Sequence, residues 1–164
     1  MLLFFLKADI LLIKKYLLKE GDTIMLKKFE VSNYKNFKEP VQIMFDKIGG
    51  YQFNSECITN DNISKMLIYG RNATGKTNLG KALMDISINM SGAHFFPTQK
   101  GSYLNADSDE KFATFKYDFQ FKDDKVKYVY KKISEAELLD EELIINGDRI
   151  FYYNFETNEY DFKN

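Results

Sequence analysis

Cysteine, histidine and arginine are scarce in this sequence, and tryptophan is absent. The 164 residues include one cysteine and one histidine, which are Cys57 and His94. These counts exclude an intrachain disulfide, a cysteine-rich zinc site and a histidine-cluster metal site. Because the chain does not depend on disulfides, we expect it to work in a reducing cytoplasm.

The charge balance and the lack of a long hydrophobic run set further limits. The formal net charge is −1 at pH 7, so no overall positive field favours a nucleic acid as a partner. No stretch reaches the roughly 20 consecutive apolar residues that a membrane-spanning helix needs. With 45% hydrophobic residues, the chain has the composition of one folded domain.

One stretch carries a specific chemical signature. Gly70–Thr77 fits the pattern G-x-x-x-x-G-K-[ST] at every fixed position. Lys65–Tyr69, just before it, predicts a short apolar strand, and the residues after it, to about Ser91, have the apolar spacing of a helix. Strand, loop and helix together are the setting of a phosphate-binding loop. The candidate cofactor-binding residues of this stretch are Gly70, Arg71, Asn72, Ala73, Thr74, Gly75, Lys76, Thr77 and Asn78.

The chemistry expected of this loop is the binding of a triphosphate. The first turn of a helix offers N–H groups without partners and the positive end of the helix dipole. Glycines let the backbone approach the phosphates closely. Lys76 should reach the β- and γ-phosphates of ATP, and the Thr77 hydroxyl should bind Mg²⁺. We therefore expect ATP and Mg²⁺ as cofactors, with Thr77 as the predicted metal ligand.

The first 24 residues, Met1–Ile24, differ from the rest and leave two interpretations open. They read either as an amphipathic helix that lies on a membrane or a partner, or as upstream sequence translated from a misplaced start. The second interpretation follows because Met25 begins a strand-like segment and the codons of Glu20–Asp22 can spell a ribosome-binding element. The folded domain is predicted to span residues 25–164.

Strand patterns occur on both sides of the loop. The last third of the chain alternates aromatic and polar residues, which is typical of half-buried strands, and Asn146-Gly147 predicts a tight hairpin turn. We interpret the aromatic side chains as the core of an antiparallel meander rather than as a surface on which nucleic-acid bases stack. The predicted strands are Met25–Ser32, Val41–Phe45, Phe115–Phe121, Val126–Tyr130, Leu143–Ile145, Arg149–Tyr153 and Tyr160–Phe162.

Three features carry a resemblance to a known group of proteins. They are the element Asn33-Tyr34-Lys35-Asn36-Phe37 after the first strand, Asn72 at the third position of the loop, and the meander after the helix. From about Met25 to its end, the chain resembles the N-terminal half of ABC-type ATPases of the SMC, RecF and OLD-like group. The closest likeness is to bacterial AAA-family ATPases of the phage-defence kind.

The resemblance implies an α/β P-loop NTPase fold, with Asn33 and Lys35 near the nucleotide. It also implies an aromatic residue upstream of the loop that stacks on adenine; Tyr51 either does so or simply anchors its own loop. Ala73 stands where the family commonly has glycine, which is tolerable if the backbone φ there is negative.

Hydrolysis in this group needs an Asp-Glu pair at the end of an apolar strand, called Walker B, and a signature motif supplied across a dimer. The one Walker B candidate is Leu138–Glu142, but Glu137 interrupts the required apolar strand, which favours a charged helix end or strand entry instead. No catalytic residue is predicted. We expect the N-terminal lobe of an incomplete ATPase, completed by a missing C-terminal half or by a homodimer, and DNA is implied only by the family resemblance.

Two other functions compete with the ATPase lobe. One is a non-catalytic remnant or interaction module that binds nucleotide weakly or not at all. The other is a small P-loop kinase, which needs several arginines in its lid. The chain has only Arg71 and Arg149, and this argues against a kinase.

Overall fold

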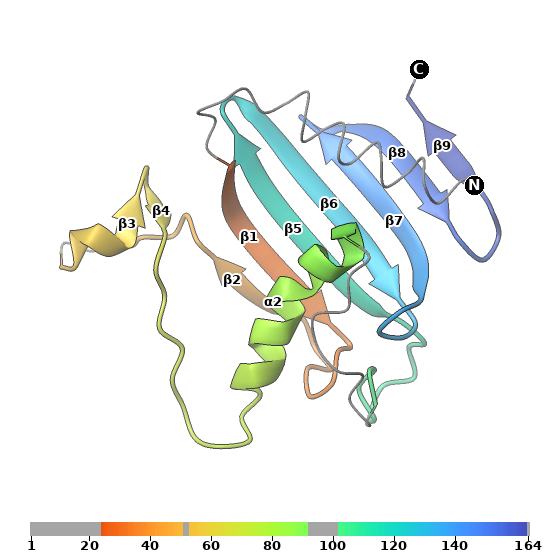
Figure 1. Cartoon of the computed structure of the whole chain (residues 1–164), viewed down its shortest axis with the longest axis horizontal. Helices are drawn as coiled ribbons and strands as arrows, with labels where there is room; N and C mark the ends of the chain where they lie inside the picture. The colour runs from red at the N-terminus through yellow and green to blue at the C-terminus, as the bar shows by residue number, and fades with distance from the viewer. Residues whose placement is uncertain (1–23, 51–52, 92–101, 164) are drawn as a thin grey trace.

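The structure is a computed structural model that describes residues 24–50, 53–91 and 102–163. Its main element is a seven-stranded sheet with the order β2-β1-β5-β6-β7-β8-β9, in which every neighbouring pair is antiparallel (Figure 1). The seven strands are β1 (Ile24–Ser32), β2 (Val41–Met44), β5 (Ala113–Phe121), β6 (Asp124–Lys132), β7 (Leu138–Ile145), β8 (Asp148–Asn154) and β9 (Tyr160–Phe162).

The remaining described elements lie between β2 and β5 in the sequence. A short 3-10 helix, η1 (Ser55–Cys57), leads into a small hairpin of β3 (Ile58–Thr59) and β4 (Asn62–Ile63). Helix α2 (Lys76–Ser91) then crosses one face of the large sheet (Figure 1). Residues 64–75 connect β4 to α2 without forming a helix or a strand.

The core lies between α2 and the sheet, and it is built largely of aromatic rings. Alternate residues of β5 and β6 are buried, as the aromatic–polar alternation predicts. Phe115 and Tyr130 stack with ring centroids 5.0 Å apart, and the Tyr117 hydroxyl donates to the Ala82 carbonyl oxygen of α2 at 2.8 Å. The expectation that these rings form a core is therefore confirmed, and the hydroxyls of Tyr117, Tyr128 and Tyr130 all contact the helix.

Charged residues of the sheet also pair across neighbouring strands. Glu30 lies opposite Lys116 in the β1–β5 register, and their side chains form an ion pair at 2.7 Å. Lys131 and Asp140 pair in the same way between β6 and β7, at 2.8 Å. Such cross-strand pairs suit a sheet that faces water on one side.

The hairpin predicted at Asn146-Gly147 is confirmed. Asn146 has φ 53° and Gly147 has φ 90°, the left-handed backbone that the tight turn between β7 and β8 requires. The other predicted strands of the last third also form, so the antiparallel meander is present from β5 to β9.

The predicted fold class, an α/β P-loop NTPase, is wrong. The described strands form antiparallel sheets, and α2 is the one α-helix in that part of the chain. Lys65–Tyr69 forms no strand; Leu67 is 86% and Tyr69 88% exposed. No described residue shares a backbone hydrogen bond with residues 66–69. A strand is stable only when it pairs with other strands. Lys65–Tyr69 has the composition of a strand, but no described strand pairs with it.

The N-terminal segment lies mostly outside the described residues, because 1–23 precede them. Ile24 is already the first residue of β1 and Met25 is the second. No helix in the described ranges is long and apolar enough to cross a membrane.

Candidate functional site

The loop Gly70–Thr77 leads directly into α2, whose first residue is Lys76. Ala73 has φ 64° and Gly75 has φ 92°, so the chain takes a left-handed conformation twice within three residues. Alanine at position 73 was expected to be tolerable if its φ were negative, but the φ is positive. Glycine adopts a positive φ without strain, which gives a physical reason for the glycine that the resembled family commonly has here.

The loop presents several backbone donors that have no partner in the described part of the chain. The first loop-to-helix hydrogen bond runs from Leu79 N–H to the Gly75 carbonyl oxygen at 2.8 Å. The N–H groups of Lys76, Thr77 and Asn78 precede it, and none of them finds a described acceptor. Unpaired N–H groups at a helix start are the usual ligands of bound anions.

The side chain of Lys76 folds back over the loop. Its ammonium donates to the Gly70 carbonyl oxygen at 2.9 Å and to the Arg71 carbonyl oxygen at 2.5 Å. Thr74 closes the same turn, because its hydroxyl donates to the Arg71 carbonyl oxygen at 2.9 Å. The positive charge is thus held by the loop that immediately precedes the unpaired N–H groups.

Asn33, predicted to lie near the nucleotide, holds backbone segments together. It is fully buried, and its amide donates to the carbonyl oxygens of Glu110 and Phe112 at 3.0 and 2.7 Å. Its Oδ1 accepts from Asn105 N–H at 3.3 Å. These three bonds use the amide for structure, so the geometry does not bring Asn33 into contact with the loop.

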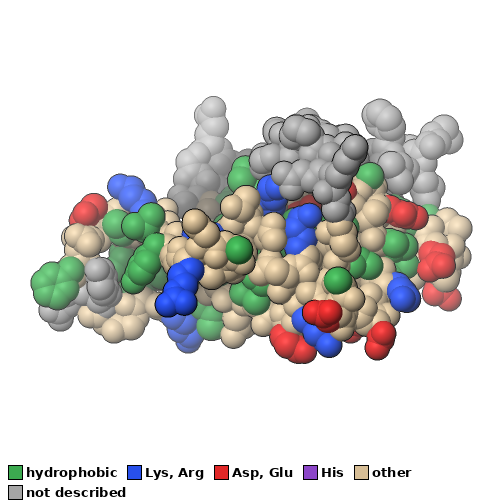
Figure 2. Space-filling model, turned by 90° about the horizontal axis from the view of Figure 1, so that it is seen from below, with side chains coloured by type: hydrophobic (Ala, Val, Ile, Leu, Met, Phe, Trp, Pro, Cys, Tyr) green, Lys and Arg blue, Asp and Glu red, His purple; other side chains and the backbone are tan. Residues whose placement is uncertain are grey.

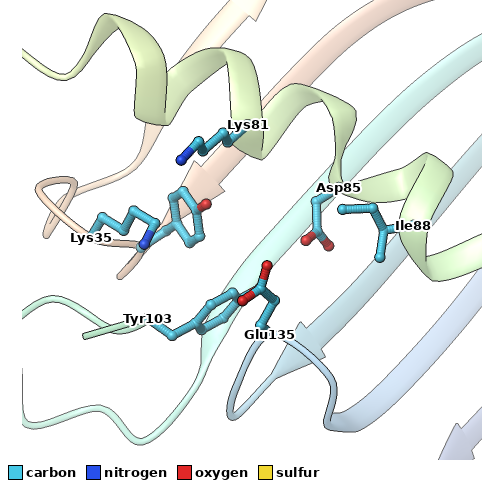
Figure 3. Close-up of a pocket in the computed structure, with 7 residues that line it drawn as sticks. Lys35, Lys81, Asp85, Ile88, Tyr103 and Glu135 are labelled. Carbon is cyan, nitrogen blue, oxygen red and sulfur yellow. The ribbon is translucent and has the colours of Figure 1, made fainter. Parts of the chain in front are cut away.

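Lys35, the second residue predicted from the same element, lines a small cavity together with Lys81 and Asp85 of α2 (Figure 3). Tyr34, Ile88, Tyr103 and Glu135 complete the lining. The cavity volume is about 30 Å³, which leaves room for only a few water molecules. It is too small for a nucleotide base.

A buried ion pair lies beside this cavity. Lys132 of β6 is 2% exposed and Asp85 is 4% exposed, and the Lys132 ammonium lies 3.2 Å from both carboxylate oxygens. The Tyr130 hydroxyl donates to Asp85 Oδ2 at 2.9 Å. Burial raises the pKa of Asp85 above its usual value, and the Lys132 charge opposes that rise. The pair fixes the middle of α2 to the sheet.

The Walker B candidate Leu138–Glu142 lies within the antiparallel strand β7, and its carboxylates are engaged there. Asp140 pairs with Lys131, and Glu141 accepts from the Tyr128 hydroxyl, which also accepts from Asn89 near the end of α2. Asn89 is thirteen residues beyond Lys76, about 20 Å along a helix. The Walker B interpretation is therefore wrong, because the carboxylates lie toward the far end of α2 from the loop.

Asn36 is the residue at the loop that sequence reasoning missed. Its Oδ1 accepts from Asn78 Nδ2 at 2.7 Å, and a β-carbon added at Gly75 would overlap its side-chain amide. It belongs to the same Asn33–Phe37 element from which Asn33 and Lys35 were chosen. The backbone turns sharply there, with positive φ at both Asn33 and Lys35, and no sequence pattern shows which of the five side chains faces the loop.

The residues present fit the predicted magnesium ion only in part. The Thr77 hydroxyl has no described hydrogen-bond partner and is exposed, so it is available as one ligand. Within the described ranges no group of three or more His, Cys, Asp or Glu side chains could hold a metal by itself. This suits Mg²⁺ that arrives bound to phosphates and takes few protein ligands. Tyr51, the adenine-stacking candidate, lies outside the described residues.

Comparisons with protein-family models and with curated protein sequences find no match for this chain.

Proposed function

We propose that the chain binds the triphosphate of Mg-ATP at the loop Gly70–Thr77. The observation that carries the proposal is that one short segment has both unpaired helix-start N–H groups and the folded-back ammonium of Lys76. A bound phosphate replaces the two carbonyl oxygens as the partner of that ammonium, which exchanges neutral acceptors for a charged one. Hydrogen bonds between charged groups are shorter and stronger than neutral ones.

The magnesium ion belongs to the same proposal. Thr77 would hold it from the protein side and the phosphates from the other, and the ion would supply positive charge that neutralises the β- and γ-phosphates. Hydrolysis is not part of the proposal for the described residues, because the Walker B candidate carboxylates of β7 are already paired with Lys131, Tyr128 and Arg149.

The open position of the loop has a consequence for selectivity. Since the loop is exposed and the cavity beside α2 is too small for a base, affinity should come mainly from the phosphates. ATP and GTP are then expected to bind within a few-fold of one another, and AMP much more weakly. Stacking of adenine on Tyr51 stays a prediction, and a strong preference for ATP over GTP would favour it.

The test is a titration of the purified chain with ATP in the presence of Mg²⁺, followed by calorimetry. Lys76→Ala should abolish measurable binding, because it removes the charge that faces the phosphates. Lys125→Ala is the matched control: Lys125 is an exposed lysine in the β5–β6 hairpin, and its loss removes the same charge elsewhere. Equal ATP affinity in the Lys76→Ala and Lys125→Ala variants would overturn the proposal.

A second candidate function is an interaction module in the cytoplasm, with a second copy of the chain or another polypeptide as partner. The exposed apolar segment Met66–Tyr69 favours it. Figure 2 shows hydrophobic side chains gathered at the end of the molecule that carries β3 and β4. If ATP fails to bind while the chain self-associates through this segment, the interaction module is the better description.

A further inference from the structure

The contact between Asn36 and the loop joins two segments that lie far apart in the sequence. Asn36 belongs to the turn between β1 and β2, whereas Gly75 and Asn78 flank the first residues of α2. The amide of Asn36 lies where a side chain on Gly75 would have to go, and its oxygen accepts the hydrogen bond from Asn78. The side chain of Asn36 therefore contacts the residue before and the residue after the pair Lys76-Thr77.

The turn that carries Asn36 is firmly held. Tyr34 N–H and Phe37 N–H each donate to the carbonyl oxygen of the other, at 3.0 and 2.8 Å. Lys35 N–H donates to the Tyr103 carbonyl oxygen at 3.0 Å, and the Lys35 carbonyl oxygen accepts from the Asn105 amide at 2.7 Å. With the buried amide of Asn33 at the start of the turn, the backbone beneath Asn36 has little freedom to move.

The loop, in contrast, has few attachments of its own. It is exposed along Gly70–Thr74, and the segment before it forms no strand that could hold it in place. The hydrogen bonds of Lys76 and Thr74 run to carbonyl groups within the loop itself. In the described part of the chain, Asn36 supplies the side-chain contacts that tie Gly75 and Asn78 to the sheet.

We propose that Asn36 is a positioning residue of the phosphate site, which it holds against the rigid turn so that the N–H groups of Lys76–Asn78 face the phosphates. The inference rests on the proposed binding of Mg-ATP. The side-chain amide suits the task because its oxygen accepts from Asn78 and its planar group packs closely against Gly75. The close contact also explains why position 75 excludes any side chain, in addition to its positive φ.

The first test of this role is a variant that adds a negative charge at position 36, and its expected effects on nucleotide binding would not arise from general destabilisation. Asn36→Asp keeps the shape and the acceptor for Asn78 but places a negative charge beside Gly75–Asn78. We expect ATP to bind at least tenfold more weakly, ADP less weakened than ATP, and both losses to shrink in high salt. Asn60→Asp is the matched control, since Asn60 is an exposed residue of the β3–β4 turn and receives the same charge.

The second test is a double-mutant cycle with Gly75. Asn36→Ala alone should weaken ATP binding about two- to tenfold, the scale of one exposed hydrogen bond. Gly75→Ala alone should weaken it far more, since the new β-carbon meets the Asn36 amide. In the double variant the clash is gone, so Gly75→Ala should cost at least threefold less affinity than it does in the wild type.

The outcomes separate this inference from the proposed function. If Lys76→Ala abolishes ATP binding while Asn36→Asp binds ATP like Asn60→Asp, the positioning role is wrong and the phosphate site stands. Strict additivity of Asn36→Ala and Gly75→Ala overturns the role in the same way. If Lys76→Ala has no effect, the phosphate site itself is wrong, and this inference fails with it. Circular dichroism and melting temperatures check that each variant is folded.

Discussion

The buried pair of Asp85 and Lys132 offers the sharpest prediction about stability. Lys132→Met keeps the length of the side chain but removes its ammonium. Asp85, which is 4% exposed, then retains only the hydroxyl of Tyr130 as a described side-chain donor. Breaking a buried pair by removing one partner leaves an uncompensated charge and costs about 3–5 kcal/mol.

The expected loss is large enough to measure by thermal or urea unfolding. In a domain of this size, 3–5 kcal/mol corresponds to a fall in melting temperature of about 6–20 °C. The double variant Asp85→Leu, Lys132→Met should recover most of the loss, because two apolar side chains replace two charges in an apolar environment. The non-additivity between the single and double variants measures the coupling of the pair.

The pH dependence gives an independent check. Burial raises the pKa of Asp85, so the folded state binds this proton more tightly than the unfolded chain, whose carboxyl has the ordinary value of 3.8. Such a group contributes most stability below the unfolded pKa, and the contribution is lost as pH rises through the folded pKa. Without the Lys132 ammonium the pKa of Asp85 rises further. The Lys132→Met variant should therefore lose more free energy of unfolding at pH 8 than at pH 5. A loss under 1 kcal/mol that does not change with pH would refute the reasoning.

Three further predictions follow from other parts of the structure. Ala73→Gly should raise the free energy of unfolding by up to about 1 kcal/mol in urea melts and leave ATP affinity within twofold, since glycine accepts φ 64° without strain; a clear loss of either would contradict that backbone. Glu30→Gln should flatten the decline of melting temperature below about pH 4.5. Pairing with Lys116, and then with Lys28, lowers the pKa of Glu30, and the stability that this pairing gives vanishes as pH falls through the folded pKa. An unchanged profile would count against the pairing. Leu67→Lys should reduce concentration-dependent self-association seen by light scattering, because Leu67 is 86% exposed; identical scattering would place the association elsewhere.

The sequence predicted the meander well, because local chemistry decides it. Asn146-Gly147 favours one turn type, and the alternation around Tyr117 and Tyr130 assigns one side of each strand to the core. Neither signal depends on distant residues. Lys65–Tyr69 has an equally clear apolar pattern, yet it forms no strand, since a strand also needs a neighbour with free backbone groups. The pattern reports the preference of the segment and not the presence of a partner.

The candidate site was predictable in its chemistry but not in its surroundings. Lys76 and the glycines follow from the fixed spacing of the loop pattern, which encodes the turn and the helix start. The resemblance pointed to Asn33 and Lys35, whereas the side chain that lies at the loop is that of Asn36. Within a five-residue turn, the direction of each side chain depends on φ values that change sign at Asn33 and Lys35, and composition does not reveal them.

The central claim is that the loop before α2 binds the phosphates of Mg-ATP through Lys76. The most direct measurement is a calorimetric titration of ATP with Mg²⁺ into three proteins, the wild type, Lys76→Ala and Lys125→Ala. A saturable heat is expected for the wild type and for Lys125→Ala, and none for Lys76→Ala. A binding isotherm for Lys76→Ala that matches the wild type, or no binding in any of the three, would contradict the claim.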